Sequence, residues 1–278
     1  MKYTLPLDGT VILESAAVPS VREPAYKGSN WQASETEYAV QVEGVGDFHV
    51  FGGREVTFCP VPGADPDWVR LYLNGLVLVA LLHQRKIISF HASSFIYGGR
   101  CVMILGETGA GKTSLTVAFA VKGAGFMSDD LTPVAFRENV PHIWSLSRKI
   151  KLRADSIKQL EIGRGNLSEA ESGTGKKYLH IEKGAEEYHR LDVIVKIETG
   201  DVEEPVFMTL PQADRFALLR SEVCSWEILA GMPETEAAYL QQLVQILEQV
   251  HFVKVIRPPM ITIAGMHEAM KLYLDSLS

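Results

Sequence analysis

Two stretches of the chain combine residue types that could do chemistry together. Residues 106–113 read GETGAGKT, which fits the pattern G-x-x-x-x-G-K-[ST]. Further on, the sequence GFMSDD ends in Asp129 and Asp130. A glycine-rich turn followed by lysine and threonine is typical of a loop that holds phosphate groups, and carboxylates nearby suit a divalent cation. The spacing therefore predicts a nucleotide site with a metal ion beside it.

The predicted loop supplies each group that a triphosphate needs. Its glycines allow the backbone to turn so that amide N–H groups face inward. A helix that begins at Lys112 adds its dipole and the free N–H groups of its first turn. Lys112 brings a positive charge to the β- and γ-phosphates of ATP, and Thr113 brings a hydroxyl to Mg²⁺. The predicted ATP-binding residues are Gly106, Glu107, Thr108, Gly109, Ala110, Gly111, Lys112, Thr113 and Ser114.

The adjacent aspartates suit two different tasks. Phosphoryl transfer needs a carboxylate that holds Mg²⁺ and a group that accepts the proton of the attacking hydroxyl. Neighbouring side chains on a strand point to opposite faces, but at a frayed strand end both can reach one site. We therefore expect Asp129 and Asp130 both to act on the nucleotide. The alternatives are a glycine turn that merely packs the helix, and aspartates that merely form a solvated turn.

The elements around these residues form a strand–loop–helix–strand unit. Residues 87–97 predict a strand or a pair of strands, and residues 100–106 predict a short buried strand before the loop. A helix over 112–121 follows, and a short strand over 125–130 delivers the two aspartates. Such a unit predicts a sheet that is at least partly parallel. From the residues alone, His91, on the first strand among apolar neighbours, is expected to be a core histidine.

The rest of the chain predicts two regions. Residues 1–62 alternate polar and apolar side chains between turn signals, which predicts β-hairpins. A cluster of prolines then marks a boundary, so we expect an N-terminal β-rich region over 1–62 and a P-loop domain over 63–278. Further expected elements are helices over about 67–84, 211–220, 234–250 and 265–277, strands over 190–198 and 252–256, a basic edge strand over 147–153 and a mobile loop over 162–177.

Composition narrows the class of protein. The 278 residues are 46% hydrophobic and 22% charged, which suits a soluble globular protein. A formal net charge of -7 argues against nucleic acid as a partner, because binding to its phosphates needs a basic surface. Three scattered cysteines indicate no disulfide framework and favour the cytoplasm. The most apolar run, 69–82, is shorter than the roughly 20 residues that span a bilayer, so we expect no membrane partner.

Residues 90–135 resemble the catalytic core of the bacterial HPr kinase/phosphorylase family. The resemblance is greater still to the HPr-kinase-like proteins that are not true HPr kinases, some of which are tailoring kinases for lasso-peptide precursors. The likeness depends on four features in the same order. They are a histidine strand with His91, the loop at 106–113, the helix-ending pair Lys122 and Gly123, and the pair Asp129 and Asp130.

This resemblance implies an α/β fold with the mixed sheet of HPr kinase and phosphoenolpyruvate carboxykinase, and a β-rich region before it. It implies ATP- and Mg²⁺-dependent transfer of the γ-phosphate to a serine- or threonine-type hydroxyl of a peptide or small protein, such as a ribosomal peptide precursor. It places Lys112, His91 and both aspartates around the γ-phosphate, with Asp130 as the base and Asp129 beside Thr113 on the metal side. The family includes oligomers, so a homo-oligomer is compatible with it.

Some residues depart from the family pattern. Ala92 stands where the family has glycine, and Thr113 stands where it usually has serine. The late signature of HPr kinases has only an echo at 255–265, VIRPPMITIAG, which argues against a true HPr kinase and against phosphorylase activity. Two other functions stay open. One is a nucleotide-dependent switch in which ATP orders residues 163–175 without phosphate transfer, and the other is a kinase for a small-molecule hydroxyl.

Overall fold

The structure is a computed structural model in which most of the chain is described. It describes residues 3–146, 149–163, 167–169, 176–180 and 187–277. In these ranges the protein combines helices with three β-sheets, so the predicted α/β class is confirmed. None of the helices in the same ranges is both long enough and apolar enough to cross a membrane.

The chain folds into two compact units, and each unit is assembled from two segments. The first unit contains Met1–Ser89 and Val223–Gln242. The second contains Phe90–Glu222 and Leu243–Ser278. The β-rich region predicted for residues 1–62 lies wholly within the first unit, which continues past it. All residues with predicted chemistry belong to the second unit.

The first unit contains a six-stranded sheet and a long helical segment. Its elements are β1 Val11–Glu14, β2 Tyr26–Lys27, β3 Trp31–Ala33, β4 Glu37–Val42, β5 Gly46–Phe51, β6 Glu55–Pro60, α1 Pro66–Tyr72, a π-helical turn Leu73–Val77, α2 Leu78–Gln84 and a 3₁₀ helix Trp226–Gly231. The strand order is β1-β6-β5-β4-β3-β2, and every pair is antiparallel except β1 with β6. The predicted hairpins are therefore confirmed. The helix predicted over 67–84 is present with a π turn inside it.

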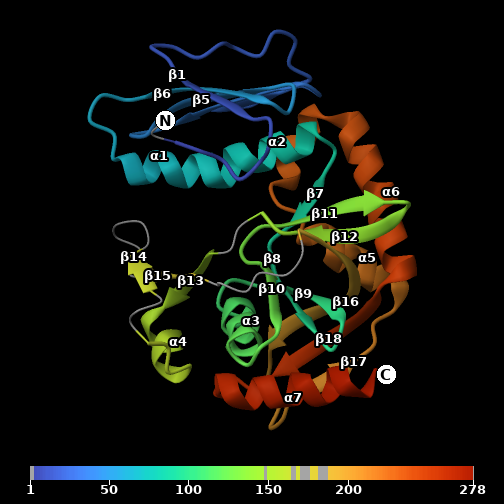
Figure 1. The fold of residues 1–278 in the computed structure, drawn as a ribbon. Coiled ribbons are helices and arrows are strands. Elements are labelled where there is room, and N and C mark those ends of the chain that lie inside the picture. Colours follow the sequence, from blue (N-terminus) through green and yellow to red (C-terminus); the bar gives the residue numbers. More distant parts are fainter. Residues whose placement is uncertain (1–2, 147–148, 164–166, 170–175, 181–186, 278) are drawn as a thin grey trace. The chain divides into compact units, whose positions relative to one another are not determined.

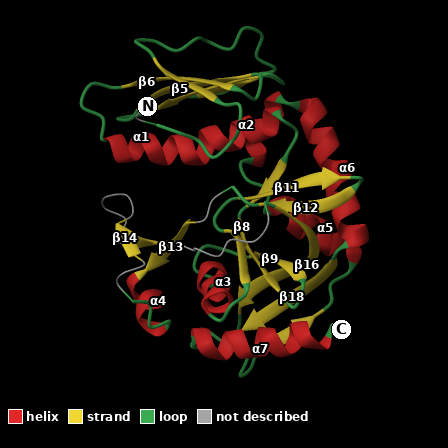
Figure 2. Cartoon of the chain, in the orientation of Figure 1, coloured by secondary structure: helices red, strands yellow, loops and turns green. Residues whose placement is uncertain are grey.

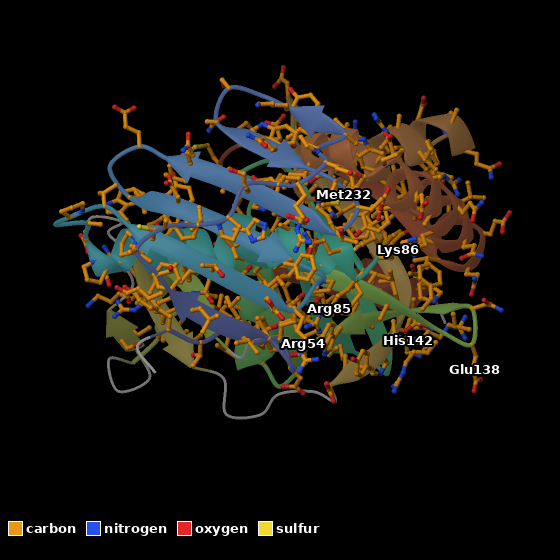
Figure 3. The ribbon with its side chains drawn as sticks, turned by 90° about the horizontal axis from the view of Figure 1, so that it is seen from above. Arg54, Arg85, Lys86, Glu138, His142 and Met232 are labelled. Carbon is orange, nitrogen blue, oxygen red and sulfur yellow. The ribbon has the colours of Figure 1, made fainter. Side chains whose placement is uncertain are left out.

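Side chains fasten the helical segment to the sheet of the first unit. Phe48 of β5 stacks on Tyr72 of α1 with 6.2 Å between ring centroids. After α2 ends, the Arg85 guanidinium donates to the carbonyl oxygens of Gly53, at 2.6 Å, and Asp8, at 3.0 Å. Figure 3 labels Arg85 and its neighbour Arg54 on this unit. A charged side chain that satisfies loop carbonyls in this way fixes the helix end without needing an apolar contact.

The second unit is built on a mixed sheet. Its strands are β8 Ala92–Tyr97, β9 Arg100–Leu105, β10 Gly125–Ser128, β11 Thr132–Arg137, β12 Val140–Trp144, β16 Tyr188–Thr199, β17 Val206–Met208 and β18 His251–Arg257, while β7 Ile88–Phe90 spans the passage between the units. The strand order is β10-β8-β9-β16-β12-β11; β18 also pairs with β16, and β17 with β18. Strands β9, β16 and β18 are parallel, so the predicted partly parallel sheet is confirmed.

Two helices cover one face of this sheet (Figure 1). They are α3 Lys112–Val121, with the predicted bounds, and α7 Ile263–Ser276. The core between helices and sheet contains Ile104 of β9, Val195 of β16 and Phe119 of α3. Because side chains alternate along a strand, Leu105 and Lys196 point to the opposite face. Helices α5 Gln212–Ser221 and α6 Pro233–Gln249 also contribute to the unit, and the second of them begins in the first unit.

A small separate sheet accompanies α3 (Figure 2). It consists of β13 Lys149–Arg153, β15 Lys176–His180 and β14 Leu167–Glu169. Helix α4 Ala154–Gln159 directly follows β13 in the chain. The mobile loop predicted over 162–177 is wrong at β14, because Leu167 lies opposite Leu179 and joins an apolar cluster with Val117 of α3. Residues 164–166 and 170–175 of that prediction, and Arg148 of the predicted basic strand, lie outside the described residues.

A buried chain of hydroxyl groups joins the strands that flank the two aspartates. The Thr132 hydroxyl donates to the Ala92 carbonyl oxygen at 2.9 Å. The Ser128 hydroxyl lies 2.6 Å from that of Thr132 and 2.5 Å from that of Ser94. Thr132 is also the first residue of β11, which forms a hairpin with β12. Glu138, at the tip of this hairpin, is labelled in Figure 3. The hydroxyl chain thus fixes both ends of the turn that contains residues 129–131.

Because of these hydrogen bonds, the Thr132 hydroxyl should contribute more to the stability of the protein than a buried hydroxyl without a partner. We expect Thr132→Val, which keeps the shape, to lower the free energy of unfolding by about 1–3 kcal/mol, because Ser128 and the Ala92 carbonyl lose a partner. Urea denaturation measures this loss. The matched control is Thr116→Val on α3. Among the described residues the buried Thr116 hydroxyl has no partner, so its removal should leave stability unchanged or raised. Equal losses in both variants would contradict the assigned role of the chain.

Candidate functional site

The predicted residues meet at one edge of the second unit's sheet. The glycine-rich loop follows β9 at the edge where the parallel strands β9, β16 and β18 end. His91 precedes β8, which begins at this edge because it runs antiparallel to β9. Asp129 follows β10, which ends here for the same reason. In open α/β sheets the carboxyl ends of parallel strands form the ligand-binding edge, so the fold gathers these residues where a ligand can reach them.

The loop begins with a close approach between two backbones. Gly106 has a φ of 154°, and a Cβ at this position would lie 2.6 Å from the carbonyl oxygen of Ile197 on β16. That distance is shorter than any real carbon–oxygen contact, so only glycine allows the loop to lie directly against β16. Gly111, with a φ of 102°, then turns the chain into α3. The two ends of the loop therefore need glycine for different reasons, one for space and one for backbone conformation.

Two cations hold the carbonyl groups of the loop. The Lys112 ammonium donates to the carbonyl oxygens of Gly106 and Glu107. The Arg257 guanidinium, at the end of β18, donates to those of Ala110, at 2.9 Å, and Gly109, at 3.4 Å. Both cations therefore lie against the backbone of the loop, and the Ala110 N–H donates to the Glu107 carbonyl oxygen at 3.0 Å. This arrangement favours an anion at its centre.

The N-terminus of α3 adds to the positive character of the loop. Gly111 caps the helix without a side-chain hydrogen bond, and the first helical bond runs from the Leu115 N–H to the Gly111 carbonyl. The N–H groups of the first turn therefore have no partner within the helix. Together with the helix dipole they attract negative charge. The residues present thus fit the phosphate groups of a nucleotide.

Lys112 is the one buried cation of the loop. Its side chain is largely buried, and burial lowers the pKa of its ammonium group. Neighbouring carboxylates raise the same pKa, most strongly Glu222 and then Asp130 and Asp129. A lysine that is desolvated yet flanked by carboxylates remains a concentrated positive charge. It is placed for the β- and γ-phosphates that the motif predicts.

Asp129 receives two hydroxyl groups on one carboxylate oxygen. Thr113 of α3 donates to its Oδ1 at 2.8 Å, and Ser93 of β8 donates to the same oxygen at 2.5 Å. Burial raises the pKa of Asp129 to about 6, against the hydrogen bonds from Ser93 and Thr113, which lower it. A divalent cation prefers oxygen ligands of this kind. Thr113 and Asp129, predicted as the metal side of the site, therefore lie together and are chemically suited to Mg²⁺.

Magnesium would need further ligands from outside the protein. Among the described residues no group of three or more histidine, cysteine, aspartate or glutamate side chains is arranged to hold a metal ion. Mg²⁺ usually keeps several waters and takes one or two carboxylates together with substrate phosphates. The pair Thr113 and Asp129 matches that sparse ligand set.

Asp130 occupies a strained backbone position next to Asp129. Its φ is 70°, and the Leu131 N–H donates to the Asp129 carbonyl at 2.9 Å, which makes a tight γ-turn with Asp130 at its centre. Such a turn is rare for a residue other than glycine. The Asp130 carboxylate is exposed, and its Oδ1 lies 3.5 Å from His91 Nδ1. The two aspartates thus face different partners.

His91 lies between two strands and not within one. It separates β7 from β8, its side chain is partly exposed, and its N–H donates to the Glu222 carbonyl at 2.8 Å. The core position expected from its apolar neighbours is therefore wrong. Because the strand is interrupted at His91, its Nδ1 instead lies 3.5 Å from Asp130 Oδ1.

The other predicted loop residues have smaller parts in this geometry. Glu107 and Thr108 are exposed, and no described contact joins their side chains to the aspartates. Ala110 is buried in the core under α3. The Ser114 hydroxyl lies 2.9 Å from that of Ser156 on α4, so it links α3 to the small sheet's helix and does not point into the loop.

Four residues of the site were not assigned a role from the sequence. Ser93 is one of two adjacent serines in a predicted strand, which does not indicate a function, and nothing in the sequence marks Glu222 as functional. Lys196 did give one, as a single charge inside the apolar run VIVKI. Arg257 was a visible basic residue without a partner, and only the fold brings it to the loop.

Comparisons with known proteins give only distant similarities, and these are to solved structures. No protein-family model matches the chain, and no curated protein matches it. Among solved structures, the Hpr(Ser) kinase/phosphatase from Coxiella burnetii is similar, with 12% sequence identity and a TM-score of 0.37. The match covers 68% of this chain and 94% of that chain.

The contact between Gly106 and Ile197 leads to a prediction for nucleotide binding. We expect Gly106→Ala to weaken binding of MgATP by about tenfold or more, because the added methyl group pushes the loop off β16. Isothermal titration calorimetry measures the affinity. Gly123→Ala is the matched control: Gly123 lies at the other end of α3, also has positive φ, and has open space for a Cβ. It should cost about 1 kcal/mol of stability and leave MgATP affinity unchanged. Equal effects on affinity would contradict the close approach.

The raised pKa of Asp129 leads to a prediction for stability. A folded-state pKa of about 6, against about 4 in the unfolded chain, means that the ionised carboxylate destabilises the nucleotide-free protein above pH 6. Asp129→Asn should therefore raise the free energy of unfolding at pH 8 by up to about 3 kcal/mol, which thermal denaturation detects as a higher Tm. The gain should shrink as the pH falls through 6 and disappear near pH 4. Asp201→Asn, at an exposed position, controls for the lost charge. A lower Tm at pH 8 for Asp129→Asn would contradict this assignment.

Proposed function

We propose that this protein is an ATP- and Mg²⁺-dependent kinase that transfers the γ-phosphate to a serine- or threonine-type hydroxyl of a peptide or small protein. The observation that carries the proposal is the division of labour between the two aspartates. Asp129 faces the loop, with the Thr113 hydroxyl on its oxygen, while Asp130 faces outward beside His91. A site that only binds a nucleotide needs the first carboxylate but has no use for the second.

The loop residues would hold ATP by its phosphates. The N–H groups at the start of α3 and the Lys112 ammonium would take the negative charge of the β- and γ-phosphates. Thr113 and Asp129 would hold Mg²⁺, which when bound neutralises charge on the phosphate oxygens. Arg257 holds the carbonyl groups of Ala110 and Gly109 by hydrogen bonds. These contacts would hold the γ-phosphate at the edge of the sheet, on the side of Asp130.

Asp130 would act as the base. The oxygen of the acceptor hydroxyl bonds to the γ-phosphorus, the bond from that phosphorus to the bridging oxygen of ADP breaks, and the hydroxyl proton passes to the Asp130 carboxylate. His91, 3.5 Å from Asp130, orients the carboxylate. The γ-turn adds to this by fixing the backbone of Asp130 before any acceptor arrives. The carboxylate therefore does not have to reorganise during the reaction.

The exposure of Asp130 supports a macromolecular acceptor. Its side chain is 68% exposed, and that of His91 is 42% exposed. An open base can be reached by a hydroxyl on an extended peptide, whereas a metabolite kinase encloses its small substrate. A ribosomal peptide precursor is an acceptor of this class. The protein is proposed to act in the cytoplasm, where ATP is supplied, with a homo-oligomer as its proposed assembly.

Transfer of label tests the proposal. The protein is incubated with Mg²⁺ and ATP labelled at the γ-phosphate, together with serine- and threonine-containing peptides, including those encoded beside its gene. We expect label on a peptide hydroxyl, and we expect Asp130→Asn to lower the rate by about 100-fold or more. MgATP affinity in Asp130→Asn should stay close to that of the unmodified protein, because Asp130 does not hold the nucleotide.

Other results lead to other functions. MgATP binding without any labelled peptide would favour the nucleotide-dependent switch. Label on free serine or on another small hydroxyl compound would favour a metabolite kinase. A labelled peptide whose formation survives Asp130→Asn would exclude Asp130 as the base. The control Asp275→Asn, on the exposed face of α7, should leave transfer unchanged.

A further inference from the structure

A buried ion pair lies beside the end of β9, the strand that leads into the glycine-rich loop. The Lys196 ammonium on β16 is paired with the Glu222 carboxylate, which follows α5. Their side chains are only 6% and 11% exposed. Burying two charges costs free energy that their attraction repays only partly. Stability alone therefore does not explain a buried ion pair at the edge of a site, and neither residue takes part in the proposed transfer of phosphate.

The sheet register places this pair across the end of the strand that leads into the loop. Leu105, the last residue of β9, lies opposite Lys196 on one side and opposite Ala92 on the other. Glu222 is attached to the second side, because its carbonyl accepts the N–H of His91, the neighbour of Ala92. The ion pair therefore crosses β9 beside Leu105. The next residue, Gly106, carries the carbonyl group that the Lys112 ammonium contacts.

Three charges consequently share one small buried region. They are the ammonium groups of Lys112 and Lys196 and the carboxylate of Glu222. Of the surrounding carboxylates, Glu222 raises the pKa of Lys112 most, while Lys196 lowers it. Glu222 thus attracts Lys112, but in the structure its carboxylate is bonded to Lys196. An unengaged carboxylate at this place would compete with ATP phosphates for the Lys112 ammonium.

We propose that Lys196 is a positioning residue that keeps the Glu222 carboxylate engaged, so that Lys112 remains available to the phosphates of ATP. This inference rests on the proposed function, since it assumes that Lys112 binds a nucleotide. Lys196 acts through Glu222 on Lys112 and touches no substrate. The ion pair thus keeps Lys112 free for ATP, because Glu222 is bonded to Lys196 and does not compete for the Lys112 ammonium.

The chain offers a matched control for this device. Lys254 lies opposite Lys196 on the neighbouring strand β18, so its side chain is on the same face of the sheet. It forms a similar ion pair with Glu198, at 2.7 Å, but that pair is 20% and 37% exposed. No hydrogen bond or ion pair among the described residues joins the Lys254 side chain to the loop. Lys254→Met should therefore remove a comparable ion pair without changing the affinity for MgATP.

Titration calorimetry with MgATP tests the inference in a set of variants. Lys196→Met should weaken MgATP binding by about tenfold or more, because Glu222 then pairs with Lys112. Addition of Glu222→Gln to Lys196→Met should restore the affinity to within about threefold of the unmodified protein. Lys196→Arg, which keeps the charge, should retain most of the affinity. Circular dichroism and thermal denaturation confirm that each variant is folded.

A second pair of variants separates this role from a merely structural one. In a Lys112→Met background, the further change Lys196→Met should alter MgATP affinity by less than about twofold, because the residue through which Lys196 acts is absent. A structural defect would weaken binding in both backgrounds. An undiminished effect of Lys196→Met in the Lys112→Met background would overturn the inference. So would unchanged affinity in Lys196→Met alone, or a folded double variant that fails to recover.

The remaining outcomes are also decisive. If Lys196→Met does not fold, Glu222→Gln alone decides: it should bind MgATP within about threefold of the unmodified protein, since no carboxylate then competes for Lys112. A loss of tenfold or more in that variant would overturn the inference. Absence of MgATP binding by the unmodified protein would overturn the proposed function and this inference with it. Normal binding there, with the predicted pattern missing, would overturn the inference alone.

Discussion

The site depends on one carboxylate oxygen, Asp129 Oδ1, on which two hydroxyl groups converge. Ser93 reaches it from β8 and Thr113 reaches it from α3, so a strand, a helix and the end of β10 are joined at one atom. The hydroxyl chain through Ser128 and Thr132 fixes the backbone on either side of this junction. The arrangement keeps Asp129 desolvated, with two hydroxyl groups on one of its oxygens. The rest of the edge is organised around that atom.

Charged groups and apolar packing have separate parts in the geometry of this edge. Lys112 and Arg257 hold the loop by its carbonyl groups, and Lys196 with Glu222 forms the layer below. Each buried charge has a partner, as the cost of desolvation requires. The apolar core between the sheet and the helices α3 and α7 supplies rigidity but no selectivity. Position is set by the core, and the direction in which groups point is set by the charges.

The sequence predicts the local elements of the site better than it predicts their neighbours. The loop, α3 and the strand before the aspartates follow from glycine spacing and apolar runs, and the structure has them at the predicted places. Glu222 could not be found, because it acts through a fold contact more than a hundred residues away from Lys112. His91 was expected in the core since its neighbours are apolar, whereas its strand breaks there. Strand β14 was missed because three residues carry too little pattern.

The γ-turn at Asp130 has a consequence for how this protein changes over generations. A positive φ of 70° costs an aspartate on the order of 1 kcal/mol relative to glycine. Random mutation without selection for chemistry would therefore move this position towards glycine, since that change stabilises the fold. An aspartate kept here stands against that drift. Stability and the proposed activity favour different residues at this position, so a descendant without that activity would lose the aspartate early.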